Sequence, residues 1–180
     1  MEALAMAKWV RTAAAALAFV EPASAADSFV DLQATYRCEV VRRLEQIYAA
    51  GDPRRDLNRY LAISLADKPN AYVQCIFFDS RSRIHCEAAS GFWAAKRGQP
   101  RTFYLPPRAV AALGKLGFDT DGSAGNFSVD QDVDKSARFG ALADFMLRAL
   151  HDGYGARSDM KLLFNAPFAQ GTPASCIPVS

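Results

Sequence analysis

Two short apolar segments joined by a polar turn constrain the fold of this chain more than any other feature. Residues 71–78 and 83–91 have the composition of strands, and Asp79-Ser-Arg-Ser82 between them has the composition of a tight turn. In a symmetric hairpin Cys75 lies directly opposite Cys86. Because side chains alternate between the two faces of a strand, one face of the hairpin then carries only apolar residues, namely Val73, Cys75, Phe77, Ile84, Cys86 and Ala88. The hairpin therefore predicts a strand register and a core face.

The other face of the hairpin is the candidate surface for a partner. It carries an apolar strip beside a few polar groups, namely Tyr72, Gln74, Ile76, Phe78, His85 and Glu87. An exposed apolar strip of this kind usually marks a binding surface. The alternative is that a helix covers this face, because the helices of an α+β protein can pack on either side of its sheet. The sequence leaves these two arrangements open.

The beginning of the chain has the pattern of an export signal. Lys8 and Arg11 precede the apolar run 12–20, and the small residues 23–25 form a cleavage pattern. The apolar run is shorter than a helix that spans a membrane. We therefore expect cleavage after Ala25, a periplasmic or secreted mature protein, and no integral membrane segment after cleavage. The alternative for this segment is a buried, alanine-rich helix.

Four cysteines fit an oxidising compartment. We favour a disulfide between Cys75 and Cys86 across the hairpin, and a second one between Cys38 in the first helix and Cys176 in the tail. Four cysteines allow three pairings, and four buried thiols are a further alternative because free cysteine behaves as a small apolar residue. No Cys-x-x-Cys motif occurs, which argues against a thioredoxin-like redox site and a zinc knuckle.

Size and charge indicate one domain without a nucleic-acid footprint. The chain has 180 residues and a formal net charge of +2, and its basic doublets lie in separate segments. Nucleic-acid binding typically needs clustered basic residues with exposed aromatic ones, so we expect no nucleic-acid partner. We assign residues 26–168 to a single domain of ordinary core size and residues 169–180 to a C-terminal tail.

The first half of the chain has the pattern of a helix followed by strands. Apolar residues at spacings of three and four predict a helix from Asp27 to Tyr48. The apolar run Tyr60–Leu65 predicts a strand, and Asp67–Asn70 has the composition of a turn. With the hairpin, these segments form a three-stranded antiparallel meander.

The second half predicts two more helices and a further strand. Pro107 is suited to the start of a short helix that ends at Gly117. A brief strand over 126–129 precedes a long helix from Asp134 to about Asp152, and residues 161–164 form a final strand or an extended segment on the core. The order α-β-β-β-α-β-α predicts an α+β fold, with an antiparallel sheet and helices packed on one face.

Five short motifs follow one another along the chain: Tyr72-Val73-Gln74, Glu87-Ala-Ala-Ser90, Leu116-Gly117-Phe118, Gly125-Asn126-Phe127 and Leu147-x-x-Leu150-x-x-x-Tyr154-Gly155. In this order they span nearly the whole mature chain, and the chain resembles the YbjN and type III secretion chaperone-like (Tir-chaperone-like) family. The resemblance implies a secretion-chaperone-like, non-enzymatic fold without a cofactor. It also implies binding of a protein segment, often by a homodimer. This chain differs from those cytosolic chaperones in the export that its N-terminal pattern predicts and in its hairpin cysteine pair.

His85 and Glu87 support an alternative function. Two residues apart on a strand, they point the same way. With an acid from residues 119–132 they have the chemistry to bind a metal or transfer a proton. One histidine and one carboxylate are fewer than the three or four ligands of a typical zinc site. We therefore predict a binding protein with no catalytic residue, metal or cofactor. A periplasmic enzyme or metal-binding protein is the first alternative, and a structural envelope component is the second.

Overall fold

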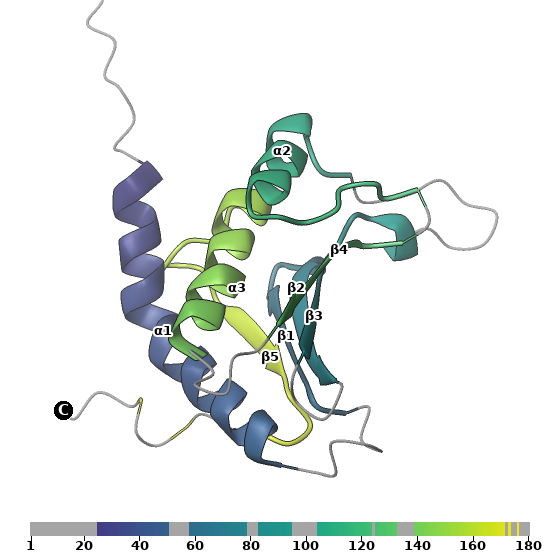
Figure 1. Cartoon of the computed structure of the whole chain (residues 1–180). Coiled ribbons are helices and arrows are strands. Elements are labelled where there is room, and N and C mark those ends of the chain that lie inside the picture. Colours follow the sequence, from purple (N-terminus) through teal and green to yellow (C-terminus); the bar gives the residue numbers. More distant parts are fainter. Residues whose placement is uncertain are drawn as a thin grey trace, which may run out of the picture.

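The computed structural model describes residues 25–50, 58–78, 83–94, 104–123, 125–132, 139–171, 173 and 176. Its elements are α1 (Ala25–Ala49), β1 (Tyr60–Leu65), β2 (Lys68–Phe78), β3 (Arg83–Ala88), the 3-10 turn η2 (Phe92–Ala94), α2 (Pro107–Lys115), β4 (Phe127–Asp132), α3 (Phe139–Tyr154) and β5 (Leu162–Asn165). The strands form one antiparallel sheet in the order β4-β3-β2-β1-β5. Figure 1 shows α1 and α3 together on one face of the sheet, with α2 near the end of α3. The predicted α+β fold with helices on one face is confirmed.

The core lies between the sheet and the two long helices. On the sheet side, alternate residues of each central strand are almost fully buried, for example Ile63, Val73 and Cys86. On the helix side, α1 contributes Leu32, Val40, Leu44 and Ile47, and α3 contributes Ala143, Met146, Leu147, Ala149 and Leu150. This set repeats at helical spacing, so the same apolar pattern that predicts the helices also forms their contact with the sheet.

The hairpin has the register that its alternation predicts. Val73 pairs with Ala88, Cys75 with Cys86, and Phe77 with Ile84. All six side chains are at most 2% exposed. The turn predicted over residues 79–82 lies outside the described residues.

The segment predicted as a turn over residues 67–70 is mostly strand. The turn consists of Ala66 and Asp67, and β2 already begins at Lys68. Proline is tolerated at position 69 because this end of β2 extends beyond its pairing with β3, so the missing N–H removes no hydrogen bond to that strand. The register with β1 also shifts between Ser64 and Leu65, where Ser64 pairs with Tyr72 and Leu65 with Lys68.

The remaining elements largely follow the predicted order. Residues 162–165 form a strand, so the last segment pairs with β1 as β5 instead of lying loosely on the core. Gly117 and Gly155, with φ of 96° and 75°, follow the ends of α2 and α3, where a left-handed conformation favours glycine. Asp134, the predicted start of the last helix, lies outside the described residues, and so does the predicted export signal before Ala25. No described helix is long and apolar enough to cross a membrane.

Candidate functional site

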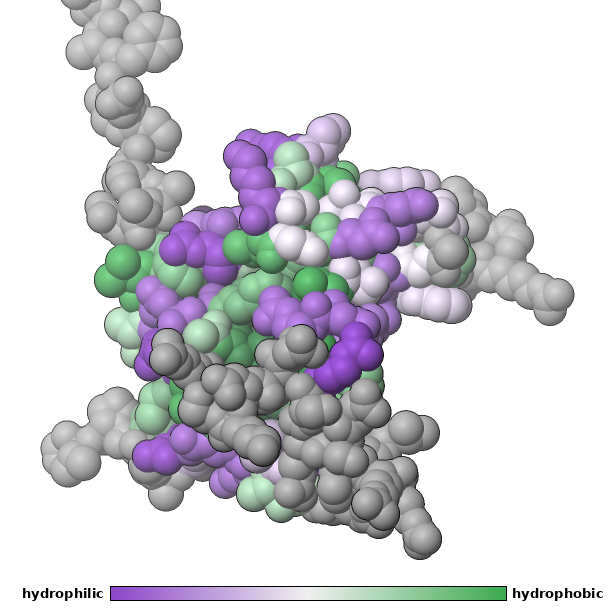
Figure 2. Space-filling model, in the orientation of Figure 1, coloured by the Kyte–Doolittle hydropathy of each residue, from purple (hydrophilic) through white to green (hydrophobic). Residues whose placement is uncertain are grey.

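The sheet face opposite the helices, here called the open face, carries the predicted partner residues. Tyr72, Gln74, Ile76, Phe78, His85 and Glu87 all lie on it, and each is partly exposed. Among the described residues no helix packs on this side, as Figure 1 shows, so the alternative in which α1 or α3 covers it is wrong. Over the helices, by contrast, Figure 2 shows hydrophilic side chains interspersed with apolar ones.

Strands that flank the hairpin extend the open face. Tyr60 of β1 lies directly beside Ile76, and Ala62 lies beside Gln74. At the β5 edge, Leu163 belongs to the same face by its register and is 42% exposed. These neighbours were not predicted, because their place depends on which strands pair with the hairpin. Their signal in the sequence is the same alternation, with Tyr60, Ala62 and Ser64 alternating with buried Leu61, Ile63 and Leu65.

The apolar half of the open face lies over β2 and β1. Ile76 and Tyr60 are side-by-side, and Phe78 follows Ile76 on the same face of β2. The guanidinium of Arg83 lies 5.0 Å from the centre of the Phe78 ring, a distance at which a cation is attracted to an aromatic face. This half therefore offers a partly exposed apolar and aromatic surface that a partner side chain can contact.

The charged half of the open face lies over β3 and β4. His85 Nδ1 is 2.5 Å from Asp130 Oδ1, and Arg83 Nη2 donates a hydrogen bond to Asp130 Oδ2 over 3.1 Å. His85 Nε2 is 3.8 Å from Glu87 Oε1. The hydrogen bond from His85, with the charges of His85 and Arg83, holds the pKa of Asp130 below its usual value. Four side chains from two strands thus form one charge network, here called the charge ladder.

The charge ladder contains an acid of the kind that the alternative hypothesis, an enzyme or metal-binding protein, needs beside His85. That alternative combined His85 and Glu87 with an acid from residues 119–132, and the structure brings Asp130 to His85. Sequence reasoning did not place Asp130 beside His85, because their pairing joins residues 45 positions apart. A carboxylate lies near each ring nitrogen of His85, an arrangement that suits charge pairing rather than activation of a nucleophile. The described residues contain no group of three or more His, Cys, Asp or Glu that could hold a metal ion.

One end of the sheet is closed by a cluster of hydrogen bonds, here called the polar cluster. Asn126 Nδ2 donates to Tyr72 Oη over 2.7 Å, Tyr154 Oη donates to the carbonyl of Ala89 over 2.8 Å, and Ser90 Oγ donates to the carbonyl of Gly125 over 2.6 Å. Burial raises the pKa of both tyrosines. These residues come from four of the five motifs that carry the family resemblance. The motifs therefore describe contacts that hold β2, β3, β4 and α3 together.

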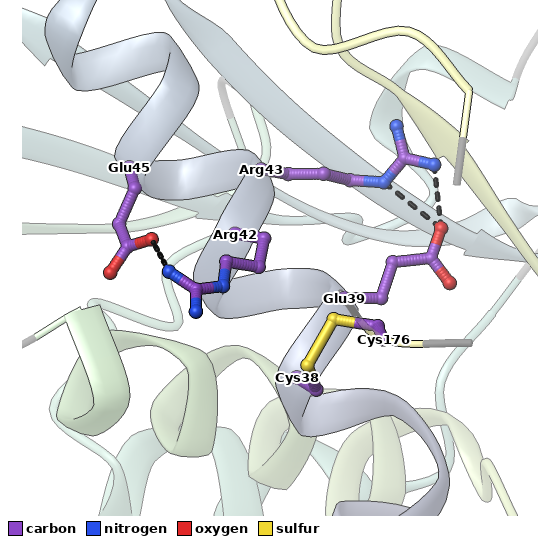
Figure 3. Close-up of a disulfide and its surroundings, with 6 residues drawn as sticks. All are labelled: Cys38, Glu39, Arg42, Arg43, Glu45 and Cys176. Carbon is purple, nitrogen blue, oxygen red and sulfur yellow. Dashed lines mark hydrogen bonds and ion pairs between the residues drawn. A yellow bond between two sulfur atoms is a disulfide. The ribbon is translucent and has the colours of Figure 1, made fainter. Parts of the chain in front are cut away.

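The structure contains two disulfides, with the pairings favoured from the sequence. Cys75 bonds to Cys86 inside the core, directly under the open face. Cys38 bonds to Cys176 at the surface of α1, 138 residues apart in sequence. Figure 3 shows the second bond beside Glu39, toward which Arg43 points. Arg43 also donates to the carbonyl of Ala169, so this buried hydrogen bond and the disulfide both hold the C-terminal segment on α1.

A separate hollow of about 510 Å³ lies between α2 and the end of α3. Its walls are mostly small or apolar, and His151, Asp152 and Arg108 supply its polar side chains. His151 Nδ1 is 2.5 Å from Asp152 Oδ1. This hollow does not include the predicted partner residues, because the open face belongs to the other side of the sheet from α3.

Comparison with known families supports the resemblance drawn from the motifs. The family model TY-Chap3, described as T3SS (YopN, CesT) and YbjN peptide-binding chaperone 3, matches residues 39–167, which is most of the chain. No curated protein and no solved structure matches the chain. The match includes every described strand and α3, and therefore the open face, the charge ladder and the polar cluster.

Proposed function

From the premise that the chain belongs to the TY-Chap3 family of peptide-binding chaperones, we propose that it is an exported, non-enzymatic protein that binds an extended protein segment on its open face. One observation carries the proposal. α1 and α3 cover only one side of the sheet, and on the other side Tyr60, Ile76 and Phe78 stay partly exposed. Partly exposed aromatic and aliphatic side chains on a regular surface are typical of a binding site.

The form of the open face favours an extended segment as its occupant. Its side chains stand in rows across strands that lie about 4.8 Å apart. A segment laid across these rows can place alternate side chains on the sheet and leave the others in solvent, because side chains of an extended chain alternate. A second copy of the protein is the competing occupant, and the experiment below separates the two.

The charge ladder supports a role in binding without catalysis. Asp130 is held by both His85 and Arg83, so its carboxylate already has partners on its two oxygens. Side chains paired in this way orient one another and give the face a fixed charge pattern. A fixed charge pattern selects partners more than it drives a reaction.

Export is the second part of the proposal. The N-terminal pattern ahead of residue 26 and the two disulfides support it, because disulfides persist mainly in oxidising compartments. The test is to express the full chain in bacteria, fractionate the cells and alkylate thiols before and after reduction. We expect the protein in the periplasmic fraction, shortened at its N-terminus, with cysteines that react only after reduction. Full-length protein with reactive thiols in the cytosol would contradict export.

Photo-crosslinking at Ile76 tests the binding site. A photoreactive amino acid at this position replaces a partly exposed side chain at the centre of the open face. The matched control places the same probe at Gln46, an exposed position on α1 in the helix layer. We expect a discrete adduct from position 76 and none of that size from position 46.

The adduct's mass identifies the occupant. A product of twice the protein's own mass shows a second copy, and any other discrete mass shows a different protein whose crosslinked peptide can be sequenced. If positions 76 and 46 give the same products, or position 76 gives none, the open face is not the binding site. The proposed function then loses the observation that carries it.

A further inference from the structure

One carboxylate of the charge ladder lacks a close partner. Glu87 is 33% exposed, and its contact with His85 Nε2 at 3.8 Å is longer than a hydrogen bond. Among the described residues, its carboxylate accepts no hydrogen bond. Asp130, in contrast, accepts one hydrogen bond on each oxygen. Glu87 is therefore the acid on the open face that remains available to a partner.

The charge ladder leaves a net negative charge beside the apolar half. The single positive charge of Arg83 balances one of the two carboxylates, so with a neutral His85 one negative charge remains. Glu87 also contributes to raising the pKa of Tyr72, after burial, which places its charge close to that phenol. Both features make the surroundings of Glu87 attractive to a cation and unattractive to an anion.

The neighbours of Glu87 suit a long basic side chain. Gln74 lies directly opposite it on β2, and Ser128 lies opposite it on β4, so an amide and a hydroxyl flank the carboxylate. Lysine and arginine have apolar stems with a charged end, and such stems pack along apolar surface while the charge stays in a polar environment. The apolar half at Ile76 provides that surface.

The spacing on the sheet then gives a sequence pattern for the bound segment. Ile76 is the diagonal neighbour of Glu87, two residues beyond Gln74 on β2. Diagonal neighbours in a sheet are about 7–8 Å apart. In an extended segment, residues two apart point the same way and are separated by about 6.6 Å. A basic residue on Glu87 therefore places the side chain two positions away on Ile76 and Tyr60.

We propose that the open face recognises extended protein segments with a lysine or arginine two positions from an apolar residue, with Glu87 as the residue that selects the basic side chain. This inference rests on the proposed function and specifies the chemistry of the client. It defines the class of partner by charge and spacing, not by identity.

Peptide selection tests this pattern directly. A phage library of random short peptides is selected on the full chain at mildly alkaline pH, where histidine is mostly neutral. The same selection is made on Glu87→Gln, Glu87→Lys and Ile76→Lys. The matched control is Glu45→Gln, which makes the same charge change at a partly exposed position on α1. Thermal unfolding of each variant shows that it is folded.

We expect wild type and Glu45→Gln to enrich peptides with the basic-x-apolar pattern. Peptides selected on Glu87→Gln should show no preference for a basic residue but should keep the preference for an apolar residue. On Glu87→Lys, the preference for a basic residue should change to a preference for an acidic one. For one enriched peptide, Glu87→Gln should weaken binding by up to about five-fold, the range of a partly exposed ion pair. Replacing the peptide's lysine by glutamine should weaken binding to the same extent. The two changes together should weaken binding no more than either change alone.

The outcomes separate this inference from the proposed function. If the enriched peptides show no preference for a basic residue, but Ile76→Lys still abolishes their binding, the role of Glu87 is wrong and the open face remains the binding site. Basic peptides that Ile76→Lys binds equally well overturn the open face itself. A selection that enriches no peptide on the wild-type protein overturns both.

Discussion

Phe77 and Phe78 are neighbours on β2, yet they belong to two different parts of the molecule. Phe77 points into the core, is 2% exposed, and makes edge-to-face contacts with Tyr48 and Phe139. Phe78 points to the open face, is partly exposed, and has Arg83 over its ring. Two residues of the same type, one peptide bond apart, therefore have different physical roles.

The sheet therefore assigns successive residues of a strand to different roles: those on the covered face stabilise the fold, and those on the open face are available for recognition. On the covered face, apolar residues gain free energy by leaving water, and each deletion leaves a cavity. On the open face, similar residues remain partly in water, so removing one changes the folded state little and changes the surface a partner would meet. The alternation of a strand is enough to divide the two roles.

The largest expected effect is the difference in stability between alanine variants of Phe77 and Phe78. Phe77→Ala should lower the free energy of unfolding by about 3–5 kcal/mol, because it removes a fully buried ring and leaves a cavity. Phe78→Ala should lower it by no more than about 1 kcal/mol, because that ring is partly solvated. Urea unfolding of both variants measures the difference. Equal losses would show that the open face is buried as part of a core.

The polar cluster should give an intermediate effect. Tyr154→Phe removes the hydroxyl that donates to the carbonyl of Ala89. Ala89 is only 3% exposed, so this carbonyl is buried. A buried carbonyl left without a donor costs about 1–3 kcal/mol. The matched control is Tyr60→Phe, the same change on the open face, for which we expect a shift within about 0.5 kcal/mol. Thermal and urea unfolding measure both. If Tyr154→Phe is as neutral as its control, the polar cluster does not stabilise the sheet.

Local patterns were sufficient to predict the covered face. The alternation of Val73, Cys75 and Phe77 specified their shared face, and a turn centred on residues 79–82 specified their register with β3. The helices followed from apolar spacing, and the order of five motifs specified the family. In each case the information lies within a few residues, or in the order of segments, so no distant contact had to be known.

The charge ladder could not be predicted in the same way. Asp130 reaches His85 only because β4 pairs with β3, and the two residues are 45 positions apart. No period within β4 specifies that neighbour. The prediction of a turn over residues 68–70 was wrong for a related reason. Proline and asparagine favour turns locally, but the paired positions Lys68 and Tyr72 on either side of them belong to β2, and the register shift leaves Pro69 and Asn70 in the strand between them. Long-range pairing therefore decides the parts that local chemistry leaves open.

Ile76→Lys should separate binding from stability most clearly. The side chain is partly exposed on the open face, so a lysine there can extend into solvent, and we expect a change of about 0.5 kcal/mol or less in unfolding free energy. Binding of a selected peptide should nevertheless be lost, because the lysine adds a charge to the apolar half. Fluorescence anisotropy with urea unfolding on the same sample measures both. Loss of stability together with binding would mean that Ile76 is a core residue.

The smallest expected effect concerns pH and the charge ladder. The hydrogen bond from His85 lowers the pKa of Asp130, helped by the charges of His85 and Arg83. Since the folded pKa is below the unfolded value of about 3.9, Asp130 contributes stability above that pH, and the contribution is lost as pH falls through the folded pKa. Wild type should therefore exceed Asp130→Asn in unfolding free energy at neutral pH, and the two curves should converge below about pH 4. Because the carboxylate is exposed and screened by water, the difference should be the smallest of the series. A difference that stays constant from neutral to acidic pH would mean that Asp130 acts through its shape or neutral hydrogen bonds, and that its charge has no measurable part in stability.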